Sequence, residues 1–472
     1  MKRLLCAAAT ILFSACVLHG QAVDPGPRGG TVGAGSPIAG LSADQQRFFT
    51  NALSQFTELQ TVPDPSPGNG GLGPTFNADS CATCHSQPAV GGTSPSTSAF
   101  PFVGPNPQVA LANALGATNV IPAFVTLNGP IREARFKYFY STPGDGEFCF
   151  AGICIGGPLD LDDPDGSVHD LFTIAGRSDA PGCTSYPQPN FTQAAADNNL
   201  ALRIPTPVFG VGLIENLSEA TLTNSLASTA AARAALGIGG VFNRSGNDTT
   251  ITRLGWKAQN KSGLIFAGEA YNVEVGVTNE AFPDERGNQV GVPPPASCLF
   301  NPTPEDTTIP LPVGSDPATS LSDIQDFELV MRFLDQPVPG PSSLSTVNGA
   351  ALFSSIGCAL CHTPSMTTAT SFVPGLNNVA ANLFSDLALH HMGVGLADGI
   401  SQGGAGPDQF RTSPLWGVGQ RVFFLSQGQT SDLLQAIKLH ASPGSEANRV
   451  IQNFNGLTVS QQQDLLNFLR SL

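Results

Sequence analysis

The chain contains two copies of one five-residue pattern, Cys81-Ala-Thr-Cys84-His85 and Cys358-Ala-Leu-Cys361-His362. In this Cys-x-x-Cys-His pattern the two thiols add to the vinyl groups of a haem, and the histidine becomes an axial ligand of the iron. With 10 Cys and 7 His in 472 residues, chance gives about 0.003 copies per chain. A structural zinc site or a redox dithiol is the alternative, but no further Cys or His follows either motif closely, as zinc would require. The two motifs therefore predict two covalently attached haem c groups.

The composition is that of an acidic chain with much loop. Its length suffices for two or three domains, and its formal net charge is -15 with a pI near 4.7. Phosphate binding draws on clustered Lys and Arg, so this charge argues against a nucleic-acid partner. A small redox protein with a basic face is electrostatically compatible with it. Gly (52) and Pro (39) are abundant and charged residues are only 12%, which favours short elements joined by loops.

Residues 1–22 are predicted to be an export signal. A basic start precedes an apolar run from Leu4 to Leu18, and Gly20-Gln21-Ala22 offers a small-residue cleavage site. A lipoprotein anchor on Cys16 is the alternative. No other stretch has 18 uninterrupted apolar residues, so we expect no transmembrane segment in the mature chain. We therefore expect a periplasmic or secreted protein.

Four cysteines remain once the signal and the haem motifs are set aside: Cys149, Cys154, Cys183 and Cys298. An even number in an oxidising compartment predicts two disulfides, which four cysteines can form in three ways. Cys149 and Cys154 are close enough in sequence to close a small loop, which would leave Cys183 to pair with Cys298. Free buried thiols are the alternative.

The chain is predicted to be mainly α with much irregular loop. Ser42 and Gln45 have capping-box spacing before an apolar stripe, so a helix is expected to begin there. A second helix is expected over residues 320–334. The middle, roughly residues 100–310, is rich in Gly, Pro, Asn and Thr and is expected to hold only a few short strands or helices.

A Pro-rich segment, residues 336–343, is predicted to link two cytochrome c-like haem domains. The N-terminal haem domain would span residues 41–335 and contain a long insertion. The C-terminal domain would span residues 344–472. In the C-terminal domain a short helix over residues 348–356 is expected to lead into the second motif, and Thr458 or Ser460 can cap a final amphipathic helix.

The ligand opposite each motif histidine separates an electron carrier from a catalyst. An iron whose sixth position holds His or Met transfers electrons, whereas an open position can bind peroxide or oxygen. His440 ends an amphipathic stretch in the same segment as His362, which suits a sixth ligand of the second haem. A surface histidine at a helix C-terminus is an equal alternative. The other candidates outside the signal are His169, His390, His391, Met331, Met366 and Met392.

The first haem has no His or Met partner in its own neighbourhood, which favours an open iron. Peroxide chemistry there needs an acid–base group that moves a proton between the two oxygens. Glu215, Glu269 and Glu274 lie in apolar stretches and are candidates, with a structural salt bridge as the alternative for each. Trp256 and Trp416 are the only tryptophans, and either could relay electrons between the haems, although core packing is the commoner role.

An acidic run from Asp160 to Asp170 has some of the oxygen-rich character of a calcium site. It lacks the register of an EF-hand and a Glu at position 12. Calcium is therefore a minor alternative cofactor beside the two haems.

Four longer stretches resemble a known family: Gly71–Pro88 around the first motif, Arg177–Cys183, Gly255–Ala258 and Phe410–Trp416. They look like the bacterial di-haem c-type oxidoreductases that are often labelled thiol oxidoreductases. That group is similar to the di-haem cytochrome c peroxidases and to their methylamine-dehydrogenase-maturing relatives. The label "thiol oxidoreductase" has no support here, because no spare Cys-x-x-Cys remains.

The resemblance implies roles for three residues. Gly255-Trp256 and Glu274-Val-Gly276 match a peroxidase pattern, which implies Trp256 as the relay and Glu274 as the distal acid–base. The helix before His440 matches the one that brings the far ligand to the peroxidases' second haem, which implies a His362/His440 haem. Two departures weaken the likeness: Trp256 lies far from the first motif, and Leu425-Ser-Gln-Gly428 stands where relatives carry His-Asp-Gly.

The predicted function is that of a periplasmic, peroxidase-like di-haem oxidoreductase. The N-terminal haem would be catalytic and the C-terminal haem would transfer electrons. The partners would be a small redox protein, as electron donor or acceptor, and hydrogen peroxide, oxygen or another small substrate. The alternatives are a pure electron-transfer di-haem cytochrome c and a di-haem oxygenase.

Overall fold

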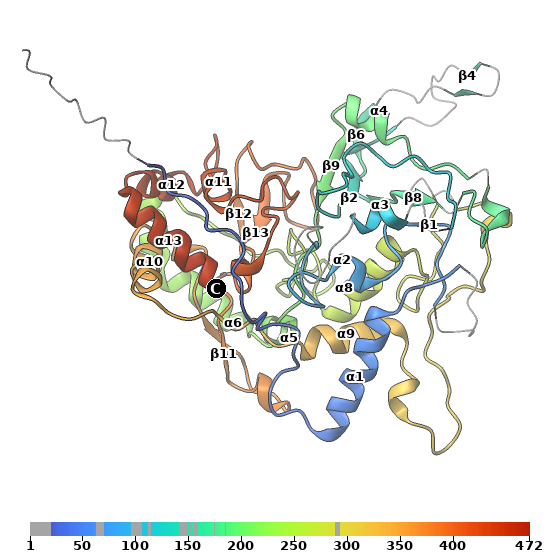
Figure 1. Ribbon diagram of the computed structural model, residues 1–472, viewed down its shortest axis with the longest axis horizontal. Helices are drawn as coiled ribbons and strands as arrows, with labels where there is room; N and C mark the ends of the chain where they lie inside the picture. The colour runs from blue at the N-terminus through green and yellow to red at the C-terminus, as the bar shows by residue number, and fades with distance from the viewer. Residues whose placement is uncertain are drawn as a thin grey trace, which may run out of the picture.

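The computed structural model shows a mixed fold built from short elements (Figure 1). It describes residues 20–62, 70–95, 106–111, 115–140, 149–150, 153–154, 159–173, 175–184, 186–287 and 293–472. The structure is 33% helical and 12% strand. The expected abundance of loop is therefore confirmed, but the prediction of a mainly α fold is corrected to a mixed fold. The predicted signal up to residue 19, with the alternative lipid site Cys16, lies outside the described residues. No described helix is both long and apolar enough to cross a membrane.

The first part of the chain contains mostly short helices and strands. Its helices are α1 (Ala43–Thr57), α2 (Cys81–Cys84), α3 (Pro107–Leu111), α4 (Phe191–Ala196), α5 (Val211–Glu215), α6 (Glu219–Ser228), α7 (Ala230–Leu236), α8 (Gly263–Ala270), which continues into the π-helical turn η2 (Tyr271–Val275), and α9 (Asp323–Phe333). Its strands are β1 (Thr75–Phe76), β2 (Glu133–Phe136), β3 (Tyr138–Tyr140), β4 (Cys149–Phe150), β5 (Ile153–Cys154), β6 (Leu159–Pro164), β7 (Val168–His169), β8 (Phe172–Thr173) and β9 (Leu200–Arg203).

The last part of the chain contains helices and a few strands of two or three residues. Its helices are α10 (Leu344–Ser355), α11 (Leu433–Lys438), α12 (Asn448–Asn455) and α13 (Val459–Ser471), and the second haem motif begins in a single 3-10 turn, η5 (Cys358–Leu360). Its strands are β10 (Met366–Thr367), β11 (Ala380–Ala381), β12 (Leu389–His391) and β13 (Gln409–Arg411). In Figure 1 the orange and red helices α10, α11, α12 and α13 gather on the left, whereas α1, α2, α3 and α4 lie on the right.

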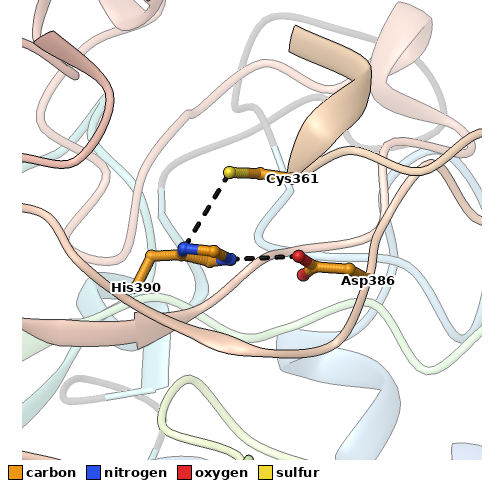
Figure 2. Close-up of side chains that lie close together, drawn as sticks. All are labelled: Cys361, Asp386 and His390. Atoms are coloured by element: carbon orange, nitrogen blue, oxygen red, sulfur yellow. Dashed lines mark hydrogen bonds and ion pairs between the residues drawn. The ribbon is translucent and has the colours of Figure 1, made fainter. Parts of the chain in front are cut away.

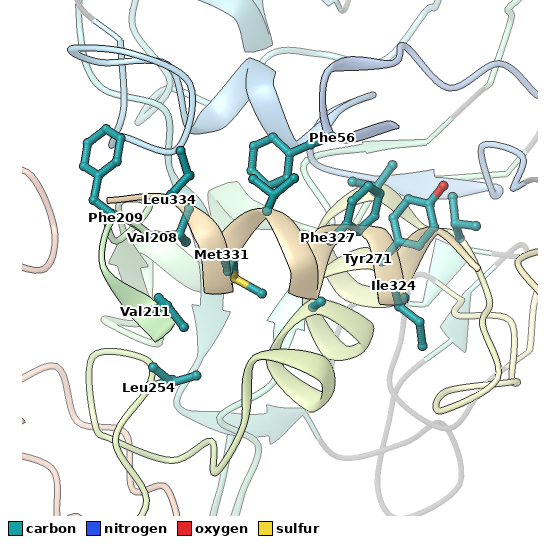
Figure 3. Close-up of a cluster of buried hydrophobic side chains, with 14 of the residues drawn as sticks. Phe56, Val208, Phe209, Val211, Leu254, Tyr271, Ile324, Phe327, Met331 and Leu334 are labelled. Atoms are coloured by element: carbon teal, nitrogen blue, oxygen red, sulfur yellow. The ribbon is translucent and has the colours of Figure 1, made fainter. Parts of the chain in front are cut away.

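Helices α1 and α9 build the core beneath the first haem motif. The predicted capping box of Ser42 and Gln45 is present at the start of α1. Phe56 of α1 packs edge-on against Phe327 of α9, with ring centroids 5.9 Å apart. Figure 3 shows the buried side chains gathered along α9, among them Met331 and Tyr271. The Cys81–His85 segment packs on these helices, with the rings of Phe56 and His85 in contact.

A three-stranded sheet in the order β7-β2-β9 crosses the middle of the chain. Glu133 of β2 pairs with Arg203 of β9 in antiparallel register. Successive side chains of a strand point to opposite faces, so Ala134 and Phe136 enter the hydrophobic core while Glu133 and Arg135 face the other way. The predicted irregular middle therefore contains a strand that carries two charges on one face.

The second core is formed by α10 and α13. The two helices come close because Gly349 has no side chain: a Cβ there would lie 2.1 Å from the Asp464 carbonyl oxygen. Phe353 and Phe468 pack between them with ring centroids 5.5 Å apart. Thr458 forms the capping box of α13, which decides between the two predicted cap residues.

Residues 20–38 form a strap, the dark blue segment of Figure 1, that runs from the second core to the end of α9. Ala22 is buried in the second core, and Asp24 forms an ion pair with Arg470 at 2.6 Å. Farther along, the Ile38 N–H donates to the Phe333 carbonyl at 2.8 Å. The strap also holds the predicted linker, because the Val338 N–H donates to the Gly33 carbonyl at 2.8 Å.

The predicted domain boundaries stay predictions, but the cysteine pairing can be compared with the structure. Cys183 and Cys298 form a disulfide with Cα atoms 4.8 Å apart, which is the pair left over by the loop argument. The other two cysteines are register partners in the β4–β5 hairpin, of which only the backbone is described.

Candidate functional site

The first haem motif is held by a single helical turn, α2. Ser80 caps this turn, since its hydroxyl accepts a hydrogen bond from the Ala82 N–H at 3.2 Å. The His85 ring then lies 2.9 Å from the Gly92 carbonyl oxygen through Nδ1. When Nδ1 donates to a carbonyl, Nε2 is the nitrogen that can bind a metal, as is usual for metal-ligating histidines. Burial lowers the pKa of His85, which favours the neutral ring that a ligand must have.

The second haem motif repeats this arrangement. The His362 ring lies 3.0 Å from the Phe384 carbonyl oxygen, again through Nδ1. Burial and, to a smaller extent, the nearby His440 lower the pKa of His362 to about 4. Both motif histidines are therefore neutral and orientated by a backbone carbonyl.

His440 lies at the end of α11 and lines the same cavity as His362. Its Nδ1 lies 2.8 Å from the Ala436 carbonyl oxygen, so this third ring is held in the same way as the two motif histidines. The geometry favours the ligand interpretation of His440 over the surface interpretation.

The other described histidines are engaged with carboxylates. His169 stacks on Phe136 and pairs with Asp165 at 2.6 Å, and His391 is exposed beside Asp408. His390 lies between Asp386 and Glu446, at 3.0 and 2.6 Å. None of these three presents a ring held only by a backbone carbonyl.

Figure 2 shows Cys361, Asp386 and His390 side by side. Among the described residues they are the one group of at least three Cys, His, Asp or Glu side chains whose potential ligand atoms lie within 4.8 Å of one another. Cys361 belongs to the haem motif, and both His390 nitrogens lie within hydrogen-bond distance of carboxylates. We interpret this group as part of the wall of the second cavity. The acidic run that suggested calcium lies mostly along the exposed strand β6, and calcium gains no support.

The first cavity holds about 1100 Å³ of space, part of it open to solvent. It is lined by Cys81, Cys84 and His85 at one side and by charged side chains from distant parts of the chain. Three of these charged side chains determine the acid–base chemistry available in the cavity: Glu274, Glu133 and Arg135. Its lining residues fall between Phe56 and Met331.

Glu274 reaches this cavity because of the turn that carries it. It belongs to the π-helical turn η2, a rare element that is common at functional sites. Gly276 ends the turn with φ 74°, and a Cβ there would lie 2.1 Å from the Thr75 carbonyl oxygen. The Glu274 carbonyl accepts hydrogen bonds from the Asn77 and Ala78 N–H groups at 2.7 and 3.1 Å. Glycine therefore lets the Glu274 segment pack directly against the chain that leads into the first motif.

Glu133 and Arg135 are functional candidates that the sequence analysis missed. They form an ion pair at 2.6 Å on the cavity face of β2. Arg203, opposite Glu133 on β9, also lines the cavity and pairs with Asp398 at 2.8 Å. The alternation of charged and apolar residues in Glu133-Ala-Arg-Phe136 is the signal that could have found the strand.

The two carboxyl groups share one proton. Burial and the adjacent Glu133 carboxylate raise the pKa of Glu274 well above its usual range. Burial raises the pKa of Glu133 as well, but Arg135 and a hydrogen bond with Glu274 outweigh this effect and lower it to about 2. Near neutral pH the proton therefore resides on Glu274, in hydrogen-bond contact with the Glu133 carboxylate.

The second cavity is larger and more apolar. It holds about 1430 Å³, part of it open to solvent, and contains Cys358, Cys361, His362 and His440. Most of the remaining lining is aliphatic or aromatic, contributed by residues of the C-terminal segment.

Trp256 is the one described residue that lines both cavities. Its ring is nearly buried, and its Nε1–H donates to the Ile204 carbonyl at 2.9 Å. Its position between the cavities agrees with the predicted relay. Trp416, by contrast, is packed in the hydrophobic core against Gly210.

The other carboxylates and the methionines predicted as candidates lie in different parts of the structure. Glu269 lines the first cavity and is hydrogen-bonded to Asn260, whereas Glu215 accepts from the Gly263 N–H at the start of α8 and does not line it. The three methionines lie in three places: Met331 in the lining of the first cavity, Met392 in that of the second and Met366 in the core. The first cavity thus contains a sulfur side chain from a region far from the motif, which its sequence neighbourhood did not reveal.

Both cavities fit a haem c. Each contains two cysteines and a histidine orientated by a backbone carbonyl. The donor set is the one that covalent haem attachment requires.

A family model described as "di-haem oxidoreductase, putative peroxidase" matches residues 166–472. The chain belongs to the di-haem oxidoreductase family. No curated protein matches the chain. The match covers well over half of the chain and includes Trp256, Glu274, the second motif and His440, whereas the first motif precedes it.

Membership in the di-haem oxidoreductase family confirms the family that the sequence resembles. The family name supports haem as the cofactor and a peroxidase-like oxidoreductase activity. It does not assign a role to any single residue, so the roles of Glu274, Trp256 and His440 rest on the geometry described above.

Proposed function

We propose that this di-haem oxidoreductase reduces hydrogen peroxide with electrons from a small redox protein. One difference between the cavities supports the proposal: a protonated carboxyl group lines the first cavity, whereas a second orientated histidine, His440, lines the cavity that contains His362. A site with an acid–base group suits catalysis, and a site with two histidines suits electron transfer. The first haem would be held by Cys81, Cys84 and His85, and the second by Cys358, Cys361, His362 and His440.

In the first cavity, the bound haem would supply the iron to which peroxide binds and the electrons that reduce it. In its ionised form, Glu274 would accept a proton from one peroxide oxygen and return it to the other. The raised pKa suits this role, because it makes the ionised Glu274 a stronger base than an ordinary carboxylate. Glu133 keeps this pKa high, and Arg135 keeps Glu133 ionised.

The reaction requires two electrons and two protons for each peroxide, and it yields two waters. Two one-electron deliveries are therefore needed, and the second cavity would receive them. Trp256 lines both cavities and is the residue through which we expect the electrons to pass. The net charge of -15 favours a donor with a basic face.

We place the protein in the periplasm or outside the cell. The predicted signal over residues 1–22 supports this location. So do the Cys183–Cys298 disulfide, which an oxidising compartment would maintain, and covalent haem attachment, which bacteria carry out outside the cytoplasmic membrane.

Peroxide titration of the purified holoprotein, with and without a reduced small cytochrome, tests the proposal. We expect peroxide to change the haem spectrum and the cytochrome to be oxidised at two equivalents per peroxide. A spectrum that ignores both peroxide and carbon monoxide would favour the pure electron-transfer alternative. A stable oxygen complex in the isolated protein, with no peroxide turnover, would favour an oxygenase.

A further inference from the structure

Eight arginines are buried in the described chain, and two of them differ from the rest. Five form ion pairs with carboxylates, namely Arg135, Arg177, Arg203, Arg233 and Arg470. A sixth, Arg253, donates to the carbonyls of Ile214, Glu215 and Leu217. The two that remain are Arg411 and Arg421.

Arg411 and Arg421 have no carboxylate partner among the described residues. Arg411 donates one hydrogen bond, to the Arg253 carbonyl at 3.1 Å, and the Arg421 guanidinium donates none within the described chain. The Nε atoms of both are buried without a partner. Burial lowers the pKa of each to about 10, and for Arg411 the charge of Arg421 adds to the effect, so the two guanidinium groups lie close together.

Both arginines face the second cavity. They are only 6% exposed, and both line the space that contains His362 and His440. They also line a small adjoining cavity together with Gly255, which itself borders the first cavity. The Arg411 N–H donates to the Trp256 carbonyl at 2.9 Å. The pair therefore stands in the wall that separates the two cavities.

Two buried cations in the wall of one cavity, without a carboxylate partner among the described residues, are strongly unfavourable in a protein interior. Guanidinium groups in such a position normally bind carboxylates or phosphates through paired N–H···O hydrogen bonds. The anion must come from whatever fills the second cavity. A haem carries two propionate carboxylates, so the expected occupant supplies the missing charge.

We propose that Arg411 and Arg421 bind the propionate carboxylates of the second haem and raise its reduction potential. This inference rests on the proposed function, because it requires a haem attached to Cys358 and Cys361. The negative carboxylates stabilise the oxidised iron, because it is the more positive form. The positive charges of Arg411 and Arg421 offset the carboxylates, so the reduction potential rises. Arg411 and Arg421 are thus binding residues that also tune the acceptor of the electrons.

The test uses the holoprotein with Arg421→Gln, Arg411→Gln and Arg421→Lys, compared with Arg253→Gln as the control. Arg253 is buried to a similar degree but is satisfied by backbone carbonyls, and it lines neither cavity. The reduction potential of each haem is measured by spectroelectrochemical titration, and the propionate bending bands by resonance Raman spectroscopy.

We expect both Gln variants to retain two covalent haems and to shift the potential of the second haem downward, with altered propionate bands. Arg421→Lys should leave the potential close to the wild-type value, because the positive charge remains, but should alter the propionate bands. Arg253→Gln should change neither the potential nor the bands. An unchanged potential and unchanged bands in Arg421→Gln would overturn the inference. If that variant does not fold, unchanged bands in Arg421→Lys would overturn it equally. A wild-type protein without a second covalent haem would instead overturn the proposed function.

Discussion

The two cavities are built in different ways. The second is lined almost entirely by residues 353–469, and only Ile238 and Trp256 come from elsewhere. The first takes its lining from segments spread between Phe56 and Met331, with short strands and turns in between. A site that only has to hold a cofactor can be made from one compact segment. A site that also has to place an acid beside it needs contributions from distant segments.

The cavities also differ in charge. The first contains a carboxyl pair with one shared proton, balanced by Arg135. The second contains apolar side chains, the histidines His362 and His440, and two arginines without a carboxylate partner among the described residues. The first surroundings suit proton movement, and the second suit a fixed electron acceptor.

Replacing Glu274 by Gln should give the largest change. The amide cannot accept and return a proton, so we expect peroxide turnover to fall by about 10²- to 10⁴-fold, the usual contribution of a general acid–base. The spectrum of the second haem should not change, because Glu274 lines only the first cavity. Glu269→Gln is the matched control, since Glu269 lines the same cavity but is bound to Asn260. Equal losses in both variants would contradict the assignment.

Removing the Cys183–Cys298 disulfide should weaken only the first half. The bridge spans 115 residues, and closure of a loop near that length stabilises by about 5 kcal/mol in the chain-entropy model. We expect the double Ser variant to unfold at lower denaturant concentration when followed by the first haem's absorption. The second haem's transition should stay in place. Parallel shifts of both transitions would mean that the halves unfold as one unit.

Replacing Asp24 by Ala should weaken the second half instead. It leaves Arg470 buried and unpaired, which costs about 3 kcal/mol for a buried ion pair. Burial raises the pKa of Asp24, but Arg470 and the Leu433 N–H outweigh this and lower it below 3.8. The stabilisation is therefore complete above pH 4 and is lost as the pH falls through the folded value. Acid unfolding of the wild type and variant should converge at low pH, and a constant difference would contradict the ion-pair account.

Replacing Glu133 by Gln should shift a pH profile rather than abolish activity. Glu133 raises the pKa of Glu274 through its negative charge. If the free carboxylate of Glu274 accepts the peroxide proton, kcat/KM of the wild type rises as the pH increases through that pKa. Without the charge the pKa of Glu274 falls, so the rise should move to lower pH. A profile that stays in place would show that the two carboxyl groups are not coupled.

Replacing Trp256 by Phe should have the smallest effect on stability. The Ile204 carbonyl loses its hydrogen bond, which costs about 1 kcal/mol. Oxidation of the donor cytochrome should become slower, while the reaction of peroxide with the fully reduced protein should keep its rate. The two rates can be separated by stopped-flow absorption. Loss of both rates together would indicate a packing role instead of a relay.

The elements with local signals could be predicted from the sequence. The capping box of Ser42 and Gln45 and the helix over 320–334, which the structure places at Asp323–Phe333, could be predicted because each signal lies within one short stretch. For the last helix the sequence left Thr458 and Ser460 open as caps, and the structure selects Thr458. The haem motifs were recognisable for the same reason, since all five residues are consecutive. The 348–356 helix was predicted too short, as α10 begins at Leu344.

The charged part of the site could not be predicted in this way. Glu133, Arg135 and Arg203 come together only because β2 and β9 pair across the chain, and strand pairing over such a distance leaves little trace in a single sequence. Arg411 and Arg421 became visible only when their burial and the absence of a carboxylate among the described residues were known. Glu274 was found through the family resemblance, and its protonation follows from Glu133.

Electron paramagnetic resonance of the oxidised holoprotein tests the central difference between the cavities most directly. We predict one high-spin ferric haem, in the cavity that holds Glu274, and one low-spin haem with two histidine ligands, His362 and His440. Two low-spin signals would contradict the account, because both irons would then be closed to peroxide.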